Sequence, residues 1–193
     1  MRIIRGVLIG LLTVLATGAG VLYYTEINAE QELENTVKTT NIMEIEKKIH
    51  DQVNAERTKH GLSPVRFDMK LTEIARAYSQ QMARENFFSH YDPQGNDFTD
   101  RYNAAAFNCA IRQGENVHTG SENLFLIHVG KWISPFGSVL EYYTTDEIAH
   151  EVVKGWMNSP SHRDNILTAF WQSEGIGLTI AKDGKIYVTE NFC

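Results

Sequence analysis

The first strong pattern in the chain is a helical stripe of apolar residues between positions 41 and 61. Residues spaced three or four positions apart share one face of an α-helix, and the stripe consists of Ile42, Ile45, Ile49 and Val53. Asn41, followed three residues later by Glu44, is typical of a capping box at a helix start. Gly61 marks the end, because glycine readily adopts the left-handed conformation that closes helices. The pattern predicts one amphipathic helix between Asn41 and Gly61.

A second stripe with the same period follows. Its members are Leu71, Ala75, Tyr78 and Met82. Asp68 stands where an N-cap is expected, so the pattern predicts a helix that runs to about Asn86. His90 comes soon after that end, in a loop closed by Pro93 and Gly95.

A third amphipathic helix is predicted after position 144, and it ends in a sharp joint. Thr144 and Glu147 form a second capping box, and the buried face carries Ile148, Val152 and Trp156. Pro160 cannot continue this helix, but it suits the first position of a new one, with Ser159 as N-cap. His162 is therefore expected in the first turn of the new helix. A histidine fixed at a rigid joint is a candidate ligand or acid–base group.

The strand signals come late in the chain. Residues 175–181 and 185–192 read as two strands, and Asp183-Gly184 between them is typical of a hairpin turn. Residues 126–143 are rich in aromatic side chains and are expected to form a strand, a hairpin or a flap, whereas 96–120 read as irregular. Helices at both ends with strands mostly late predict an α+β fold with a small antiparallel sheet.

The N-terminal segment differs from the rest. Residues 6–24 contain no charged side chain, follow Arg2 and Arg5, and would span roughly 28 Å as a helix, which is close to a bilayer core. Residues 1–24 therefore predict a signal anchor or a cleaved signal peptide, and the apolar run through Tyr24 favours the anchor. Residues 25–40 are polar and acidic and are expected to form a stalk.

Charge and cysteine content narrow the class of protein. The 193 residues carry a formal net charge of -6, and without Arg2 and Arg5 the balance is 16 basic against 24 acidic residues. This balance excludes a nucleic-acid-binding protein, which would carry a basic face. The N-terminal helix is then the only predicted contact with a membrane. Cys109 and Cys193 are the only cysteines. In an exported chain such a pair is expected to form a disulfide.

Four blocks of residues resemble the CAP superfamily, also called the SCP domain, which includes cysteine-rich secretory proteins, antigen 5 and plant pathogenesis-related proteins. The blocks occur in the family's order and span about residues 45–193: Val53-Asn54-Ala55-Glu56-Arg57 with Gly61-Leu62-Ser63-Pro64, Asn86-Phe87-Phe88-Ser89-His90, Glu122-Asn123-Leu124, and the joint from Trp156 to Leu167 with the strands behind it. The Asn-Ser-Pro-small-His-Arg form of the joint is similar to the bacterial and archaeal branch. The resemblance implies an α-β-α sandwich, and we expect the CAP/SCP domain to occupy residues 41–193.

The resemblance also implies a site. Many family members line a cavity with two histidines and two acidic residues that can hold a divalent metal. Carried over by motif, the histidines are His90 and His162, and the first acidic residue is Glu122, with Glu115 as a rival. Glu122 is preferred because apolar residues follow it, as in the family. The second acidic position falls on Ser159, so this chain departs from the four-ligand pattern.

Other candidate residues are weaker. His150-Glu151 begins a zincin motif, but Lys154 stands where the second histidine must be, and no Gly-x-Ser-x-Gly nucleophile elbow occurs. Among the remaining histidines, His50 and His60 are expected to face solvent. His118 and His128 flank the Glu122 block and are candidates for a supporting role around it.

These observations predict an exported domain, extracytoplasmic and membrane-anchored or else secreted. Its His90–Glu122–His162 groove would bind a divalent metal such as zinc, or a small polar ligand. Two alternatives stay open. One is a metal-dependent hydrolase that acts on cell-envelope peptide or protein. The other is a surface interaction module in which the three residues only brace the fold.

Overall fold

The computed structural model describes residues 31–38, 40–133 and 139–193. A four-stranded sheet in the order β1-β7-β8-β4 forms the centre. The elements of the chain are α2 (Ile42–Lys59), β1 (Arg66–Phe67), α3 (Met69–Glu85), α4 (Phe98–Ala104), β2 (Ile111–Gln113), β3 (Asn116–His118), β4 (Ser121–His128), β5 (Gly130–Ile133), β6 (Val139–Tyr142), α5 (Thr145–Asn158), α6 (Pro160–Ile166), β7 (Ser173–Ile180) and β8 (Lys185–Phe192).

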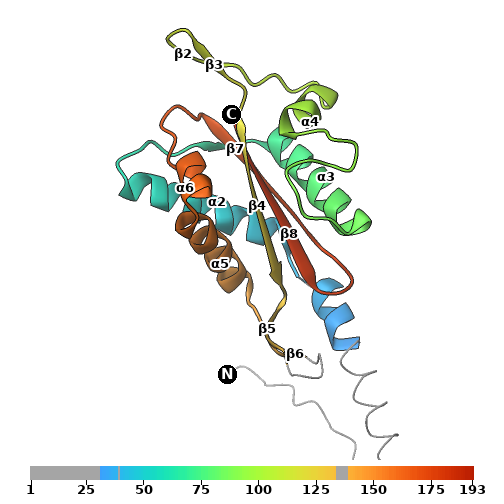
Figure 1. Ribbon diagram of the computed structural model, residues 1–193. Coiled ribbons are helices and arrows are strands. Elements are labelled where there is room, and N and C mark those ends of the chain that lie inside the picture. The colour runs from blue at the N-terminus through green and yellow to red at the C-terminus, as the bar shows by residue number, and fades with distance from the viewer. Residues whose placement is uncertain (1–30, 39, 134–138) are drawn as a thin grey trace, which may run out of the picture.

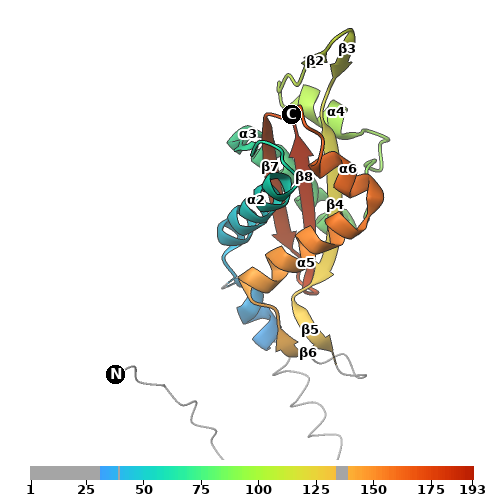
Figure 2. The same ribbon diagram turned by 90° about the vertical axis from the view of Figure 1, so that its left-hand side faces the viewer.

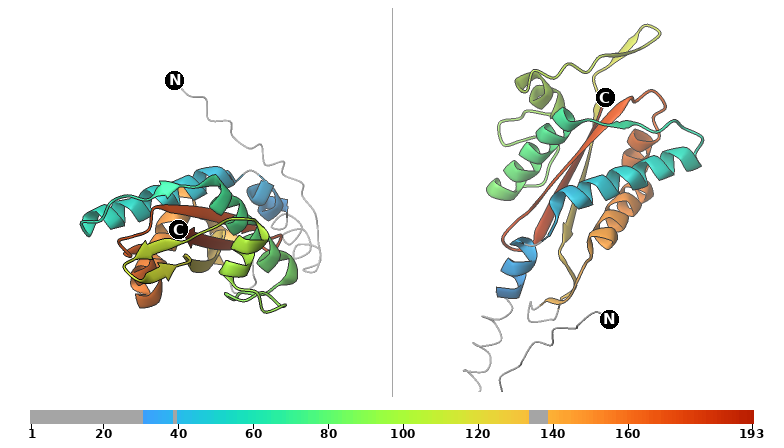
Figure 3. Two further views of the ribbon diagram at one scale, coloured as in Figure 1. Left: turned by 90° about the horizontal axis from the view of Figure 1, so that it is seen from above. Right: turned by 180° about the vertical axis from the view of Figure 1, so that it is seen from behind.

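Helices cover both faces of this sheet. In Figure 1, α3 and α4 lie to the right of the strands, and α5 and α6 lie to the left. Figure 2 shows α2, α5 and α6 in front of the strands, and the view from behind shows α2 crossing the domain beside α5 (Figure 3). The result is the predicted α-β-α sandwich, so the α+β fold class is confirmed.

Alternating side chains divide the sheet between two apolar clusters. The larger cluster fills the face under α2 and α5, where its members include Ile49, Val152, Trp156, Leu178 and Val188. The smaller cluster lies under α3 and consists of Tyr78, Met82, Leu124 and Tyr187. The helical stripes in the sequence therefore mark the faces that are buried.

Two glycines let α3 approach the sheet closely. Gly175 and Gly177 lie on β7, and a Cβ atom at either position would overlap the backbone of α3. The lack of a side chain brings α3 against β7, and this contact fixes where the chain emerges after the helix.

The predicted helix boundaries agree closely with the structure. Asn41 caps α2 and accepts from the Glu44 N–H, although Glu44 does not complete the box. Asp68 caps α3, and Asn86 closes it in the left-handed conformation with φ of 53°. Thr144 and Glu147 form the full capping box of α5.

Several expectations need correction. The span 96–120 is not irregular, because it contains α4, capped reciprocally by Asp97 and Asp100, and the β2–β3 hairpin. The central sheet is mixed, because β1 pairs with β7 in parallel. The pairing covers only two residues, which are too few to give an alternating pattern in the sequence. Within the predicted stalk, residues 31–38 are helical, and Leu33 packs against the larger apolar cluster.

The aromatic span 126–143 divides between the end of β4 and the β5–β6 hairpin, as one of the predicted alternatives proposed. No helix among the described residues is long and apolar enough to cross a membrane. The predicted anchor or signal peptide at 1–24 lies outside the described residues.

Candidate functional site

His90 is placed by the loop that follows α3. The left-handed Asn86 turns the chain out of the helix. Tyr78 then donates its hydroxyl to the Ser89 carbonyl over 2.6 Å, and the Ser89 hydroxyl accepts from the Tyr91 N–H. The loop is therefore fastened on both sides of His90, whose side chain is 49% exposed.

Glu122 lies on β4 and faces the α3 side of the sheet, with only 1% of its side chain exposed. Its Oε1 lies 2.9 Å from His90 Nδ1, and its Oε2 accepts from Arg101 Nη2 over 2.6 Å. An ionised carboxylate paired with arginine can only accept, so His90 carries its proton on Nδ1. His90 Nε2 is then the nitrogen available to a ligand.

Arg101 is a site residue that sequence reasoning missed. It extends from α4, and its guanidinium lies 3.4 Å from the centre of the Tyr78 ring. There it offsets the charge of Glu122 and makes a cation–π contact. The Asp97–Asp100 capping box is the local signal that could have placed Arg101 on a helix, but nothing in the sequence joins that helix to Glu122.

His162 lies in the first turn of α6, as predicted. Pro160 occupies the first helical position, although the Ser159 side chain makes no capping hydrogen bond. Asn123 on β4 donates to the His162 carbonyl over 3.1 Å. Asn165 donates to the Glu122 carbonyl over 3.2 Å. These two amides connect α6 to the same strand that carries Glu122.

The two imidazoles meet around the edge of the sheet. Because β4 is an edge strand, a loop from the α3 layer and a helix from the α6 layer can converge there. The ring centres of His90 and His162 are 6.5 Å apart, with 46° between the ring planes. Burial, followed by the nearby charge of His90, lowers the pKa of His162. His162 is therefore kept in the neutral form that binds metals and accepts hydrogen bonds.

A cavity of about 370 Å³ opens beside His90 and Glu122. Its wall also includes Tyr91, Phe98 and Asn165, so it combines aromatic surface with a few polar groups. Small-molecule sites commonly have this composition. His162 is not among the residues that line this cavity.

The arrangement of donors limits how a metal could be held. Both Glu122 oxygens are already engaged, one by His90 and one by Arg101. Within residues 31–38, 40–133 and 139–193, no group of three or more His, Cys, Asp or Glu side chains could hold a metal ion. In the structure Glu122 orients His90, and direct ligation by Glu122 stays a prediction.

The other candidates lie away from the site. Glu115 is exposed in the turn of the β2–β3 hairpin. His118 packs 4.2 Å from the Phe170 ring, and His128 bonds to the Asp183 carbonyl, so neither supports Glu122.

One expectation about the first helix is wrong and another is confirmed. His50 does not face solvent. Its side chain is 14% exposed and its Nδ1 lies 2.5 Å from Glu174 Oε1. The expectation failed because β7 packs over α2 at this position. His60 does face solvent at the end of α2.

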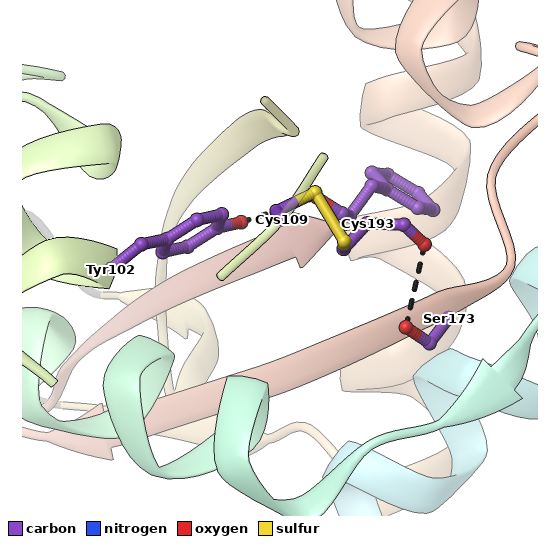
Figure 4. Close-up of a disulfide and its surroundings, with 5 residues drawn as sticks. Tyr102, Cys109, Ser173 and Cys193 are labelled. Carbon is purple, nitrogen blue, oxygen red and sulfur yellow. Dashed lines mark hydrogen bonds between the residues drawn. A yellow bond between two sulfur atoms is a disulfide. The ribbon is translucent and has the colours of Figure 1, made fainter. Parts of the chain in front are cut away.

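The predicted disulfide is present. Cys109 and Cys193 are joined, with their Cα atoms 5.6 Å apart. Figure 4 shows the bond at the end of β8, where Tyr102 donates to the Phe192 carbonyl and Ser173 donates to the Cys193 carbonyl. The bond ties the segment between α4 and β2 to the end of the central strand.

An α-β-α sandwich with two histidines converging at the edge of its sheet defines a domain of the SCP type. The family model described as the cysteine-rich secretory protein family, CAP, matches residues 50–192. The chain belongs to the CAP family.

Relatives in Bacillus subtilis agree. The chain is 31% identical over 149 residues to the uncharacterized protein YkwD, covering 77% of this chain and 48% of that protein. It is 30% identical over 147 residues to the uncharacterized membrane protein YlbC, covering 76% of this chain and 34% of that protein. The chain thus spans half or less of the curated relatives it matches.

Solved structures share the fold. An extracellular protein with an SCP domain from Bacillus anthracis aligns with a TM-score of 0.55 at 24% identity, covering 77% of this chain and 39% of that one. An outer surface protein from Borrelia burgdorferi aligns at 0.57 and 16% identity, covering 79% and 93%. A cysteine-rich secretory protein from Staphylococcus aureus aligns at 0.52 and 15%, covering 80% and 39%.

Proposed function

We propose that this chain is an exported CAP domain whose His90–Glu122–His162 groove binds a divalent metal such as zinc, or a small polar ligand. One observation carries the proposal. Two imidazoles from opposite layers of the sandwich lie 6.5 Å apart, and a buried carboxylate orients one of them. A carboxylate behind a metal-binding histidine is the usual supporting arrangement, because it fixes the tautomer and the direction of the ring.

The ring separation is somewhat longer than a shared ion requires. A zinc ion at ~2.1 Å from one nitrogen of each ring lies about 3.2 Å from each ring centre, so tetrahedral coordination would place the centres about 5.2 Å apart. From the observed 6.5 Å the rings would have to approach each other by about 1.3 Å, and the half-exposed His90 has the freedom to move. With two protein ligands, water or a bound molecule would complete the coordination, so we expect modest affinity.

The adjoining cavity favours a ligand that is both polar and able to stack. Tyr91 is 61% exposed at the rim, and Phe98 lines the wall near His90. A small molecule with a flat or apolar face could pack on these rings. Its polar groups would then be within reach of His90 Nε2 and the Asn165 amide.

An extracytoplasmic location supports this function. The Cys109–Cys193 disulfide is stable in an oxidising compartment. Of the similar proteins, the Bacillus anthracis protein is described as extracellular and YlbC as a membrane protein. We extend this location to the chain, with the membrane anchor at residues 1–24 as part of the proposal.

The first test is calorimetric titration of the purified full chain with Zn²⁺. We expect one site per chain, lost in His90→Ala and in His162→Ala and kept in the control His60→Ala, which removes an exposed histidine on α2. Affinity should fall as the pH is lowered, because protonated imidazole cannot bind metal. Absence of binding in a folded wild-type protein would favour the interaction module, in which these residues brace the fold.

A further inference from the structure

A second polar cluster lies inside the sandwich, on the opposite face of the sheet from Glu122. Glu174 on β7 and Glu190 on β8 are both fully buried. The register of β7 and β8 makes them diagonal neighbours on one face of the sheet, and their carboxyl groups interact directly. Two carboxylates cannot both stay ionised at such a short distance in a dry interior, because no other interaction offsets their repulsion and the loss of hydration. The chemistry of this pair is not explained by the proposed ligand groove.

The partners of each carboxyl group are specific. Glu174 Oε1 faces His50 Nδ1 at 2.5 Å, and Glu190 Oε2 accepts from Asn123 Nδ2 over 2.7 Å. Glu174 Oε2 and Glu190 Oε1 are buried and, within the part of the chain that the structure describes, have no donor. A proton held between the two carboxyl groups would give these oxygens a hydrogen-bond partner.

The neutral form of His50 can be assigned from its neighbour. The Val65 N–H donates to Asn54 Oδ1, which fixes the orientation of the Asn54 amide. Asn54 Nδ2 therefore donates to His50 Nε2, and His50 carries its own proton on Nδ1. That proton is directed at Glu174, while burial lowers the pKa of His50. His50 thus supplies a hydrogen bond to the pair without adding a charge at neutral pH.

Charge balance points to one shared proton. Arg57 on α2 is the positive group that acts on both carboxyls. Its own hydrogen bonds go to the Ser63, Ile166 and Thr168 carbonyls. One proton on the pair leaves one negative charge against Arg57, so the cluster is neutral. Two ionised carboxylates would leave an uncompensated charge in the interior, which is costly.

The pair is connected to the ligand groove through one amide. Asn123 uses both hydrogens of Nδ2, one toward Glu190 and one toward the His162 carbonyl. Asn165 donates to Asn123 Oδ1 over 2.8 Å and fixes the direction of that amide. A change in the charge of Glu190 must therefore change the hydrogen bond that Asn123 makes to His162.

We propose that Glu174 and Glu190 form a buried proton-binding site that holds one proton between them, and that Asn123 links the state of this site to the position of His162. The proton site does not depend on the proposed function. Its effect on ligand binding at His162 does rest on the proposed function.

The sign of the pH dependence follows from the pKa shift. Burial raises the pKa of Glu174 to about 8, and burial together with the charge of Glu174 raises the pKa of Glu190. Because the folded state holds a proton that the unfolded chain releases near pH 4.5, this contribution to stability is complete below about 4.5. It is lost as the pH rises toward about 8.

The test compares the wild-type full chain with Glu190→Gln by urea unfolding from pH 5 to pH 9. Glutamine keeps a donor toward Glu174 and accepts from Asn123, so the variant mimics the protonated pair at every pH. Relative to the variant, the wild-type folding constant should fall by about tenfold per pH unit between roughly pH 5 and 8, the change that one proton produces. Glu115→Gln, which alters an exposed carboxyl in the β2–β3 turn, should behave as the wild type does.

Nuclear magnetic resonance supplies a second measurement. The Arg163 amide shares a peptide plane with the His162 carbonyl, so its nitrogen shift should change near pH 8 in the wild type and not in Glu190→Gln.

If Glu190→Gln does not fold, Glu174→Gln gives the same mimic with the roles of the two residues exchanged. Parallel pH profiles for wild type and variant would overturn the proton site. A flat Arg163 shift alongside different profiles would overturn the link to His162. Neither result depends on Zn²⁺ binding.

Discussion

At the scale of single residues, the site depends on how the charge of Glu122 is compensated. Glu122 is buried on an edge strand and would be costly there without a partner. Arg101 supplies the positive charge, and His90 supplies the second hydrogen bond. The same pair explains why His90 presents Nε2 outward. Arg101 therefore acts on His90 through Glu122. The pairing keeps Glu122 an acceptor for the Nδ1 proton of His90, and Nε2 is the nitrogen that a ligand contacts.

Replacing Arg101 should be strongly destabilising. Arg101→Ala leaves a buried carboxylate without its cation and removes the contact with the Tyr78 ring, so we expect a loss of about 3–5 kcal/mol in the free energy of unfolding. Urea denaturation measures it. Lys154→Ala is the matched control, since Lys154 pairs with Glu151 at the surface and should leave the midpoint nearly unchanged. Equal effects of the two substitutions would contradict the argument.

At the scale of elements, close contact between α3 and β7 sets the geometry of the site. The helix ends beside the sheet, and the loop that begins at Asn86 carries His90 to β4. The contact depends on positions where a side chain has no space, notably Gly177. Displacing α3 would therefore also move His90 relative to His162.

Gly177→Ala tests this contact. The added methyl group would overlap the backbone of α3 near Arg76, and we expect a loss of roughly 1–3 kcal/mol in unfolding free energy, the usual cost of overpacking. Thr179→Ala, two residues along the same face of β7, removes atoms instead of adding them and should cost less than about 1 kcal/mol. If α3 does shift, Zn²⁺ affinity should fall in Gly177→Ala and stay unchanged in Thr179→Ala.

At the scale of the whole molecule, the disulfide is a covalent cross-link between two segments that are far apart in the sequence. Cys109 and Cys193 are separated by 84 positions. The bond joins the segment after α4 to the end of β8, next to the Ser173 and Tyr102 hydrogen bonds (Figure 4). Without it, the end of the central strand would be held only by non-covalent contacts, which are its ladder, these hydrogen bonds and apolar packing.

Removing the disulfide should destabilise the entire domain. The double variant Cys109→Ser, Cys193→Ser gives the unfolded chain back the freedom of a long loop, so we expect a loss of about 2–5 kcal/mol in unfolding free energy. Thermal and urea unfolding measure the change. Thiol labelling of the unreduced wild type should be near zero, and two reactive thiols in the native protein would contradict the bond.

The sequence by itself determined helices α2, α3, α5 and α6 and the identity of the paired histidines. Caps such as Asp68 and Thr144 act on backbone groups within one turn, so their effect is visible without the fold. The stripes around Ile49 and Trp156 mark buried faces for the same reason. Motif resemblance added His90, Glu122 and His162, and the structure brings their side chains to one edge of the sheet.

Only the tertiary structure decided which polar groups meet. Arg101 reaches Glu122, and His50 reaches Glu174, across separations of 21 and 124 residues that no local pattern encodes. No local pattern marks Glu174 or Glu190, yet the pairing of β7 with β8 and the packing of α2 bury them together. Periodicity reports which face of an element is buried. Which charges share that interior depends on how the elements are stacked, because burial and proximity are properties of the assembled fold.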